Sequence, residues 1–304
     1  MEDNILSVVM EVGGKGVETH YVDGFTDETS VHCASMTKSV LALLIGIALD
    51  CGYLESIDKP VIDFFPDYHV KRGEKLLSKI KIRDLLSMRA PYKGKGEPYT
   101  RVLSSDDWTL SMLDFLGGKQ EIGSFHYATL GTHILSGILD RVTPNGALQF
   151  ANDHLFAPLG IYAVKPIAIR SREDYMAFIY GINHRGWVCD PQGVLTGGWG
   201  LSLSTQDFLK IGRLVLNGNP TIISNYWLDL MARPHNQWQD FKYGYLWWLQ
   251  ESGVQMAMGD GGNVLYVDRN RNVLVVILSR FKPRTHDRIA FIEKDLIAKH
   301  EISI

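Results

Sequence analysis

Strand-forming segments lie at both ends of this chain, and this placement limits the folds that it can adopt. Near the amino terminus, residues 5–12 are apolar and β-branched, and residues 17–22 alternate after a glycine-rich turn. Near the other end lie three more short apolar segments, residues 254–258, 263–267 and 273–278. We expect all of these segments to form one antiparallel sheet to which both ends of the chain contribute.

The stretch between the two sets of strands has a helical pattern. Helices are expected at residues 35–51, 82–88 and 130–142. A further helix is expected after residues 204–207, because Ser-Thr-Gln-Asp ahead of an apolar run is the pattern of a capping box. Apolar residues also recur at helical spacing in the final segment, residues 288–300.

The chain contains no internal repeat, low-complexity tract or linker, so we expect a single domain over residues 1–304. The expected fold class is α/β (α+β), with helices flanking the antiparallel sheet. An α/β lobe would comprise residues 1–50 and 190–304, and a mostly helical lobe, residues 51–189, would be inserted between them.

Composition excludes several classes of function. The residues are 45% hydrophobic and 21% charged, as in globular proteins, so neither a disordered chain nor a coiled coil is expected. The 31 Lys and Arg against 34 Asp and Glu give a net charge of −3, and no basic patch marks a nucleic-acid or membrane partner. The three cysteines form no CxxC pair, and we expect neither a metal nor a cofactor. A small-molecule partner is expected instead.

The amino-terminal residues lack the basic and apolar segments of a secretion signal, because Met1–Asn4 are acidic and polar. The longest apolar run, Val40–Leu49, is about half the length that a membrane span requires. From these two observations we expect a soluble, cytoplasmic protein.

Ser35 and Lys38 are the sharpest chemical signal in the chain. They lie three residues apart at the start of an expected helix, so the hydroxyl and the amine face the same side. The helix that follows is apolar all round and must be buried. Burial disfavours the charged form of Lys38, which makes the amine a useful general base for a serine nucleophile. The helix dipole at Ser35 also favours developing negative charge.

The Ser-x-x-Lys spacing alone is a weak signal, because a chain of this size contains it by chance. Ser78 with Lys81 and Ser279 with Lys282 repeat the spacing in mixed polar stretches, where the lysine can reach solvent. Only the Ser35 pair begins a fully apolar helix. No GxSxG or HExxH pattern occurs, so neither an α/β-hydrolase triad nor a metallohydrolase is indicated.

Several further motifs accompany Ser35-Met36-Thr37-Lys38. They are residues 52–61 (GYLESIDKPV), 82–88 (IRDLLSM), 125–129 (FHYAT), 156–161 (FAPLGI), 190–193 (DPQG) and 196–201 (TGGWGL). Together they resemble, over nearly the whole chain, the serine hydrolases related to class C β-lactamases. That family includes penicillin-binding DD-peptidases, esterases and nylon-oligomer hydrolases. The resemblance implies a β-lactamase/penicillin-binding-protein-like fold.

The resemblance also implies roles for individual residues. Ser35 would be the acylated nucleophile, and Lys38 with Tyr127 would act as general base and later as general acid. The oxyanion hole would combine the backbone N–H of Ser35 with a second N–H from Gly262 or Asn263, because the glycine-rich break stands where the family places its third motif. Substrate contacts are expected from Thr129, Asp260, Gly261 and Trp199.

Three features depart from the family pattern. Thr129 replaces the usual Asn or Ser of the second motif, and Asp260 stands where many relatives carry Lys or His. Ser35 also falls unusually early in the chain, which supports the cytoplasmic expectation. A carboxylate at residue 260 predicts poor binding of anionic substrates, unless Arg89 or His126 supplies a compensating cation.

The expected function is hydrolysis of a small ester or amide through an acyl-enzyme on Ser35. β-Lactamase or D-Ala-D-Ala-type peptidase activity is an alternative within the same family. A catalytically inactive binding protein with the same fold is an alternative of another class, although the retention of Ser35, Lys38 and Tyr127 argues against it. The acyl group, the leaving group and the oligomeric state stay open.

Overall fold

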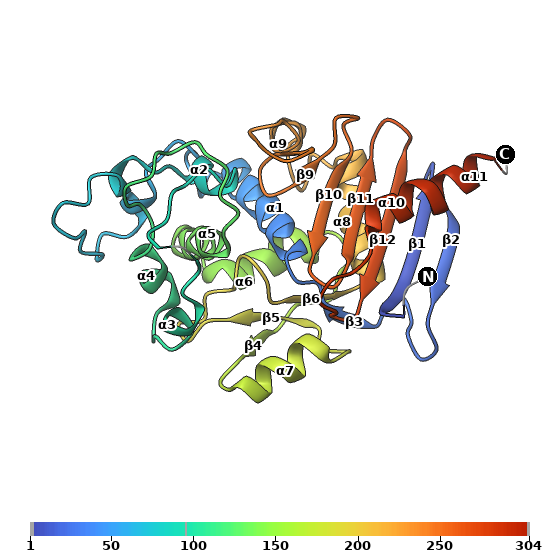
Figure 1. Ribbon diagram of the computed structural model, residues 1–304, viewed down its shortest axis with the longest axis horizontal. Helices are drawn as coiled ribbons and strands as arrows, with labels where there is room; N and C mark the ends of the chain where they lie inside the picture. The colour runs from blue at the N-terminus through green and yellow to red at the C-terminus, as the bar shows by residue number, and fades with distance from the viewer. Residues whose placement is uncertain (1–2, 95, 303–304) are drawn as a thin grey trace.

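The computed structural model describes residues 3–94 and 96–302, and its dominant feature is an eight-stranded antiparallel sheet (Figure 1). Its strands follow the order β2-β1-β12-β11-β10-β9-β8-β7. Their bounds are β1 Ile5–Val12, β2 Lys15–Tyr21, β7 Asn236–Trp238, β8 Phe241–Tyr243, β9 Trp248–Leu249, β10 Gln255–Gly259, β11 Asn263–Asp268 and β12 Val273–Ser279. β1 pairs with β12 along its length, so both ends of the chain form one sheet, as expected.

A second, four-stranded sheet has no counterpart in the expectations from sequence. It contains β3 Ser30–His32, β6 Leu201–Ser204, β5 Gly186–Cys189 and β4 Pro166–Ala168, in that order. β4 and β5 come from the chain before residue 190 and β6 from the chain after it. This sheet therefore crosses the boundary expected between the two lobes.

Helices cover both faces of the large sheet. They are α1 Met36–Asp50, α2 Ile82–Leu86, α3 Tyr99–Leu103, α4 Trp108–Leu113, α5 Thr129–Val142, α6 Gly146–Ala151, α7 Arg172–Tyr180, α8 Thr205–Asn217, α9 Asn225–Met231, α10 Arg288–Phe291 and α11 Ala298–Ile302. Short 3-10 or π segments are η1 Val61–Phe64, η2 Leu77–Lys79, η3 Asn152–Phe156 and η4 Ile292–Ile297. α8 packs on one face of β11 and β12, and α10 with η4 covers the other face (Figure 1).

The expected helix boundaries agree closely with the structure at α1, α5 and α8. The capping box at the start of α8 is confirmed, because Ser204 Oγ accepts a hydrogen bond from the Asp207 amide at 3.3 Å. The Asp207 carboxylate accepts one from the Ser204 amide at 3.0 Å. These two bonds satisfy backbone donors that the helix itself leaves unpaired.

α1 lies between the large sheet and α5, and every residue from Met36 to Ala48 is buried. The Trp227 ring packs directly on the helix backbone at Gly46, where a Cβ would lie 2.0 Å from the ring. The Trp227 indole N–H donates to the Ala42 carbonyl at 3.0 Å, which fixes α9 against α1. Across the described ranges, no helix combines the length and the apolarity that a membrane span needs.

Candidate active site

Ser35 lies directly before α1, at the N-cap position of that helix. The preceding residue, Ala34, has a φ of +50°, a left-handed conformation that is uncommon for residues with a side chain. Strained backbone of this kind concentrates at functional sites, where the surrounding structure holds it in place. The Met36 amide bonds back to the Cys33 carbonyl, whereas the Ser35 amide has no partner among the described residues. That N–H is therefore available to a ligand.

Lys38 is buried, with 1% of its surface exposed, yet it forms no ion pair with any carboxylate of the described residues. Its ammonium donates instead to neutral oxygens. They are Ser35 Oγ at 2.9 Å, the Gly198 carbonyl at 2.8 Å and, more weakly, Thr129 Oγ1 at 3.5 Å. The structure thus brings Ser35 and Lys38 together, as their spacing on one helix predicts.

Residues 196–200, Thr-Gly-Gly-Trp-Gly, form one wall around Lys38. A Cβ at Gly198 would lie 2.4 Å from the Thr129 side chain, far inside van der Waals contact. Only glycine therefore permits this segment to approach α5 so closely. The close approach is what presents the Gly198 carbonyl to the Lys38 ammonium.

Tyr127 completes the group of expected catalytic side chains. The Lys38 ammonium lies 4.9 Å from the centre of the Tyr127 ring, a cation–π distance. Tyr127 lines the same cavity as Ser35 and is 36% exposed. Its ring stacks on Trp248, with the ring centres 5.6 Å apart and the planes 24° from parallel. The structure therefore brings Lys38 against both Ser35 and Tyr127, and these two residues line one cavity.

Glu97 is a residue of the site that the sequence reasoning missed. It lines a cavity with Ser35, and its carboxylate accepts hydrogen bonds from the amides of Thr129 and Leu130. The helix dipole at the start of α5 favours a negative charge there. The Tyr99 hydroxyl also donates to Glu97, and burial together with this carboxylate raises the pKa of Tyr99. No local spacing in the sequence indicates these contacts.

The glycine-rich break forms the turn between β10 and β11, and its position differs from the one expected. The Gly262 amide donates to the Gly259 carbonyl at 3.2 Å within the turn, and the buried Asn263 pairs with Gly259 in the ladder. Neither Gly262 nor Asn263 lines the cavities that contain Ser35, whereas Asp260 lines both. Neither candidate for the second oxyanion donor therefore lines the cavities beside Ser35.

Turn geometry explains this difference. Gly261 and Gly262 have φ values of +86° and +85°, which residues with side chains rarely adopt. The Asn4 side chain donates to the Gly261 carbonyl at 2.8 Å, and Arg288 packs where a Cβ of Gly262 would lie. These glycines permit a tight turn and its anchoring to other segments, so Gly261 also lies outside the Ser35 cavities.

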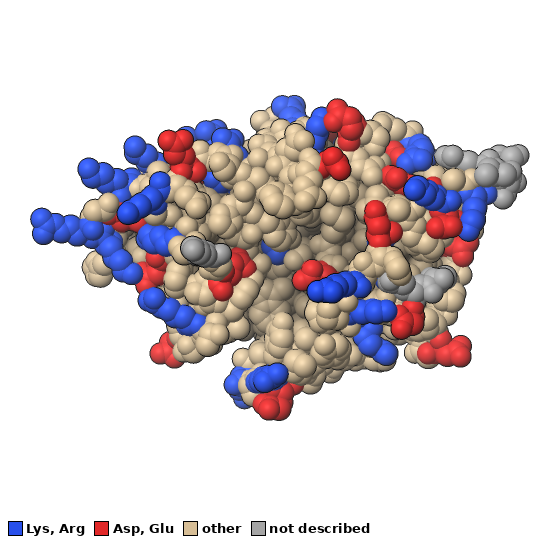
Figure 2. Space-filling view, in the orientation of Figure 1, with Lys and Arg blue, Asp and Glu red and all other residues tan. Residues whose placement is uncertain are grey.

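A cavity of about 440 Å³ opens beside Ser35. Large side chains dominate its walls: Tyr99, Leu103, Tyr175, Ile179, Trp199 and Phe281. Asp260 also lines it, and burial, followed by the Asp260 carboxylate, raises the pKa of Tyr175. Trp199 meets Tyr175 edge-on with ring centres 5.7 Å apart. Figure 2 shows this face of the molecule hollowed near its centre, with most charged side chains toward the rim. Arg89 does not line this cavity.

His32, at the end of β3, belongs to the same cavity. Burial lowers the pKa of His32 to about 4, so the ring is neutral near pH 7. Its Nε2 accepts a hydrogen bond from the Gly200 amide at 3.3 Å, which requires that nitrogen to be unprotonated. His32 therefore supports the segment of residues 196–200 rather than supplying a charge.

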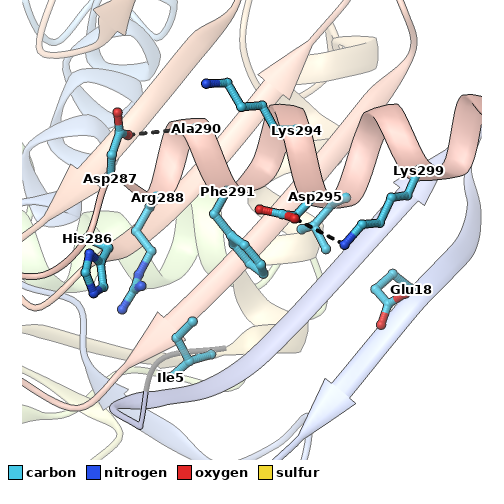
Figure 3. Close-up of a pocket in the computed structure, with 11 residues that line it drawn as sticks. Ile5, Glu18, His286, Asp287, Arg288, Ala290, Phe291, Lys294, Asp295 and Lys299 are labelled. Atoms are coloured by element: carbon cyan, nitrogen blue, oxygen red, sulfur yellow. Dashed lines mark hydrogen bonds and ion pairs between the residues drawn. The ribbon is translucent and has the colours of Figure 1, made fainter.

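Another cavity, of about 840 Å³, lies between the carboxy-terminal helical segment and β1 and β2 (Figure 3). Three of its charged side chains are used in the helical segment itself: Asp287 caps α10, and Asp295 pairs with Lys299 at 3.1 Å. None of the expected site residues lines it. In the part of the chain that the structure describes, no cluster of three or more His, Cys, Asp or Glu side chains is placed to hold a metal ion. The Ser35 cavities are therefore the candidate active site.

The chain is similar to known proteins along nearly its whole length. A family model described as Beta-lactamase matches residues 4–298. The chain is 20% identical over 296 residues to the 6-aminohexanoate-dimer hydrolase of Paenarthrobacter ureafaciens, which covers 88% of this chain and 70% of that protein.

Two solved structures show the same fold. A penicillin-binding protein from Bacillus halodurans has a TM-score of 0.72 and 17% identity, covering 96% of this chain and 95% of that one. A class C β-lactamase from Rhodobacter sphaeroides has a TM-score of 0.70 and 16% identity, covering 98% and 95%. The expected β-lactamase/penicillin-binding-protein-like fold is confirmed.

Proposed function

The chain belongs to the β-lactamase family, and we propose that it is a serine hydrolase that cleaves a small ester or amide through an acyl-enzyme on Ser35. One observation carries the proposal. The buried Lys38 ammonium lies 2.9 Å from the Ser35 hydroxyl and has only neutral partners among the described residues. A lysine kept for structure alone is rarely buried without a carboxylate partner.

The same three side chains can carry out both halves of the reaction. In acylation, the Ser35 oxygen attacks the substrate carbonyl while Lys38, in its neutral form, takes the hydroxyl proton. The bond to the leaving group then breaks, and the proton passes through Tyr127 to the departing oxygen or nitrogen. In deacylation, water attacks the ester bond of the acyl-enzyme and gives a proton to Lys38 and Tyr127. The bond between the acyl group and the Ser35 oxygen then breaks, and that oxygen takes a proton back from the same two residues.

Two backbone N–H groups are suited to stabilise the carbonyl oxygen in the transition state, and the first is that of Ser35. We assign the second to Asp260. The Gly259 carbonyl points into the turn, where it accepts from Gly262, and in a trans peptide the next N–H points the opposite way. The Asp260 N–H is thus directed away from β11. On that side Gly259 packs against Ala34: a Cβ built on Gly259 would lie 3.2 Å from the Ala34 Cβ.

The charges that line the cavities beside Ser35 favour a neutral or cationic substrate. Asp260 and Glu97 line these cavities, whereas no Lys or Arg of the described residues does. Lys38 is hydrogen-bonded to Ser35 but is buried and lines neither cavity. The Asp260 carboxylate makes no hydrogen bond within the turn, among the described residues, that would divert it from the cavity. Two like charges about 4 Å apart repel by ~1 kcal/mol in water and ~4 kcal/mol in a partly shielded cleft. A carboxylate-bearing substrate would therefore bind ~5- to 10³-fold more weakly than a neutral one.

This charge pattern argues against the alternative activity on β-lactams or D-Ala-D-Ala, because those substrates carry a carboxylate. Arg89 lines neither Ser35 cavity, and His126 lines an adjoining one. Neither therefore supplies a cation in place of the Lys or His that many relatives carry at the position of Asp260.

Labelling with a fluorophosphonate tests the mechanism. The wild-type protein should gain the mass of one phosphonyl group, and Ser35→Ala should gain none while its circular dichroism spectrum stays unchanged. Ser78→Ala is the matched control, because Ser78 also precedes a lysine by three residues but is exposed. Labelling that persists in Ser35→Ala would falsify the mechanism.

Matched esters with neutral, cationic and anionic groups test the substrate charge. Asp260→Asn should weaken the discrimination against the anionic ester, and Asp260→Lys should reverse it, since both substitutions keep the backbone N–H. Asp153→Asn, at an exposed carboxylate outside both cavities, should change nothing. A wild-type preference for the anionic ester would contradict the charge argument.

A further inference from the structure

A further cavity, of about 430 Å³, adjoins the proposed catalytic residues, and its walls are aromatic. We call it the aromatic groove; it is lined by Phe125, His126, Tyr127, Trp238 and Trp248. Phe125 stacks on Trp238 with ring centres 5.6 Å apart and planes 26° from parallel. No Asp, Glu, Lys or Arg of the described residues lines the groove. Its chemistry therefore differs from that of the acidic cavities beside Ser35.

Trp238 is the most exposed ring of the groove, with 49% of its surface accessible. It lies on β7, one of the two edge strands of the large sheet, where packing of the core does not require a tryptophan. A large aromatic side chain at the rim of a cavity supplies rigid contact area to a ligand at low entropic cost. The exposed face of Trp238 is thus available for binding.

Tyr127 is shared between the groove and the cavity that contains Ser35. In the proposed reaction, Tyr127 delivers a proton to the departing oxygen or nitrogen, so that atom must lie within hydrogen-bond reach of the Tyr127 hydroxyl. Whatever is attached to the departing atom then lies close to the Tyr127 ring. The aromatic groove adjoins that ring and offers such a space.

We propose that the aromatic groove is the leaving-group subsite and takes an uncharged aromatic ring carried by the departing alcohol or amine. This inference rests on the proposed function. The volume is sufficient, because a cavity of roughly 150 Å³ already holds a benzene ring. The absence of charged lining residues within the described chain disfavours a charged leaving group, and the stacked rings favour a flat one.

Benzyl and methyl esters of one neutral acyl group test the proposal. Benzyl alcohol and methanol have nearly equal acidity, so a difference between the esters reports binding rather than leaving-group chemistry. We expect the benzyl ester to have a kcat/KM ~10-fold above that of the methyl ester in the wild type. Trp238→Ala should lower this ratio to ~1–2, and Trp238→Phe should restore most of it.

Single-turnover measurements separate the two sides of the scissile bond. Both esters leave the same acyl-enzyme, so its hydrolysis rate should be equal from either ester and unaffected by Trp238→Ala. Tyr226→Ala, at a ring that is 70% exposed on α9 and outside the groove, should keep the wild-type ratio. Slower deacylation in Trp238→Ala would place the acyl group in the groove and overturn the proposal.

The remaining outcomes are also decisive. A ratio near 1 in the wild type, or a ratio that Trp238→Ala leaves unchanged, would overturn the leaving-group subsite while Ser35 still reacts with the phosphonate. Failure of phosphonate labelling at Ser35 would instead overturn the proposed function and this inference with it.

Discussion

Buried charges in the active site and in the surrounding scaffold are satisfied in different ways. In the scaffold, Glu11 on β1 pairs with Arg213, and Asp207 on α8 pairs with Arg185. In the site, the Lys38 ammonium meets only hydroxyl and carbonyl oxygens among the described residues. Opposite charges compensate each other's loss of water, whereas a lone buried ammonium is compensated only in part. A paired charge is explained by stability alone; the unpaired one is explained by its chemistry.

Replacing Lys38 by methionine should give the largest effect. Lys38→Met should lower kcat/KM for an ester at least ~10²-fold, because no base remains beside the Ser35 hydroxyl. The free energy of unfolding should stay the same or rise, since a neutral side chain of similar length fills the space. Ester kinetics and urea unfolding measure the two quantities, with the exposed Lys79→Met as control. Retained activity, or a large loss of stability, would make Lys38 an ordinary structural residue.

The Gly198 carbonyl, which accepts a hydrogen bond from Lys38, can be displaced without changing the lysine. Gly198→Ala should force the segment away from α5 and cost ~2 kcal/mol in the free energy of unfolding, because its Cβ would meet the Thr129 side chain at 2.4 Å. It should also lower kcat/KM ~10-fold by moving the carbonyl that holds Lys38. Gly16→Ala is the matched control, since nothing lies within 4 Å of its Cβ position. Equal behaviour of the two variants would contradict the assigned role of Gly198.

Removing a paired charge from the scaffold should lower stability and leave activity nearly unchanged. Asp207→Asn keeps an oxygen for the helix cap but removes the charge that faces Arg185, so the free energy of unfolding should fall by ~2 kcal/mol. The value of kcat/KM should stay within ~2-fold of the wild type. A loss of activity larger than the loss of stability would mean that this ion pair also serves the site.

His32 predicts the smallest effect, a loss of stability at mildly acidic pH. Its pKa is about 4 in the folded protein and near 6.5 when unfolded, so the unfolded chain binds more protons between these values. Stability should therefore be full above pH 6.5 and fall as the pH drops toward 4, by ~1 kcal/mol at pH 5.5. His32→Gln should reduce this change, as measured by urea unfolding at pH 7 and 5.5. An unchanged pH dependence would show that His32 is not its source.

The sheet and α1 could be predicted because their signals are local. β1, β12 and α1 each contain enough consecutive apolar residues to show a pattern, and the capping box before α8 lies within four residues. β4 and β5 have only three and four residues, which is too few to show an alternation. The four-stranded sheet therefore had no signal in the sequence.

The contacts of the candidate active site can also be divided into local ones, which the sequence predicts, and long-range ones, which it does not. The three-residue spacing of Ser35 and Lys38 acts within one helix, so the sequence by itself determined that they meet, and the resemblance to a family added Tyr127. Glu97 meets the start of α5 from 32 residues away, and Trp238 reaches Phe125 from another segment altogether. Only the tertiary structure decided these contacts, and it also decided that Asp260 rather than Gly262 lies beside Ser35. The physical reason is that hydrogen-bond direction in a turn and contact between distant segments depend on how the whole chain packs, whereas a helix brings residues three apart to one face wherever it lies.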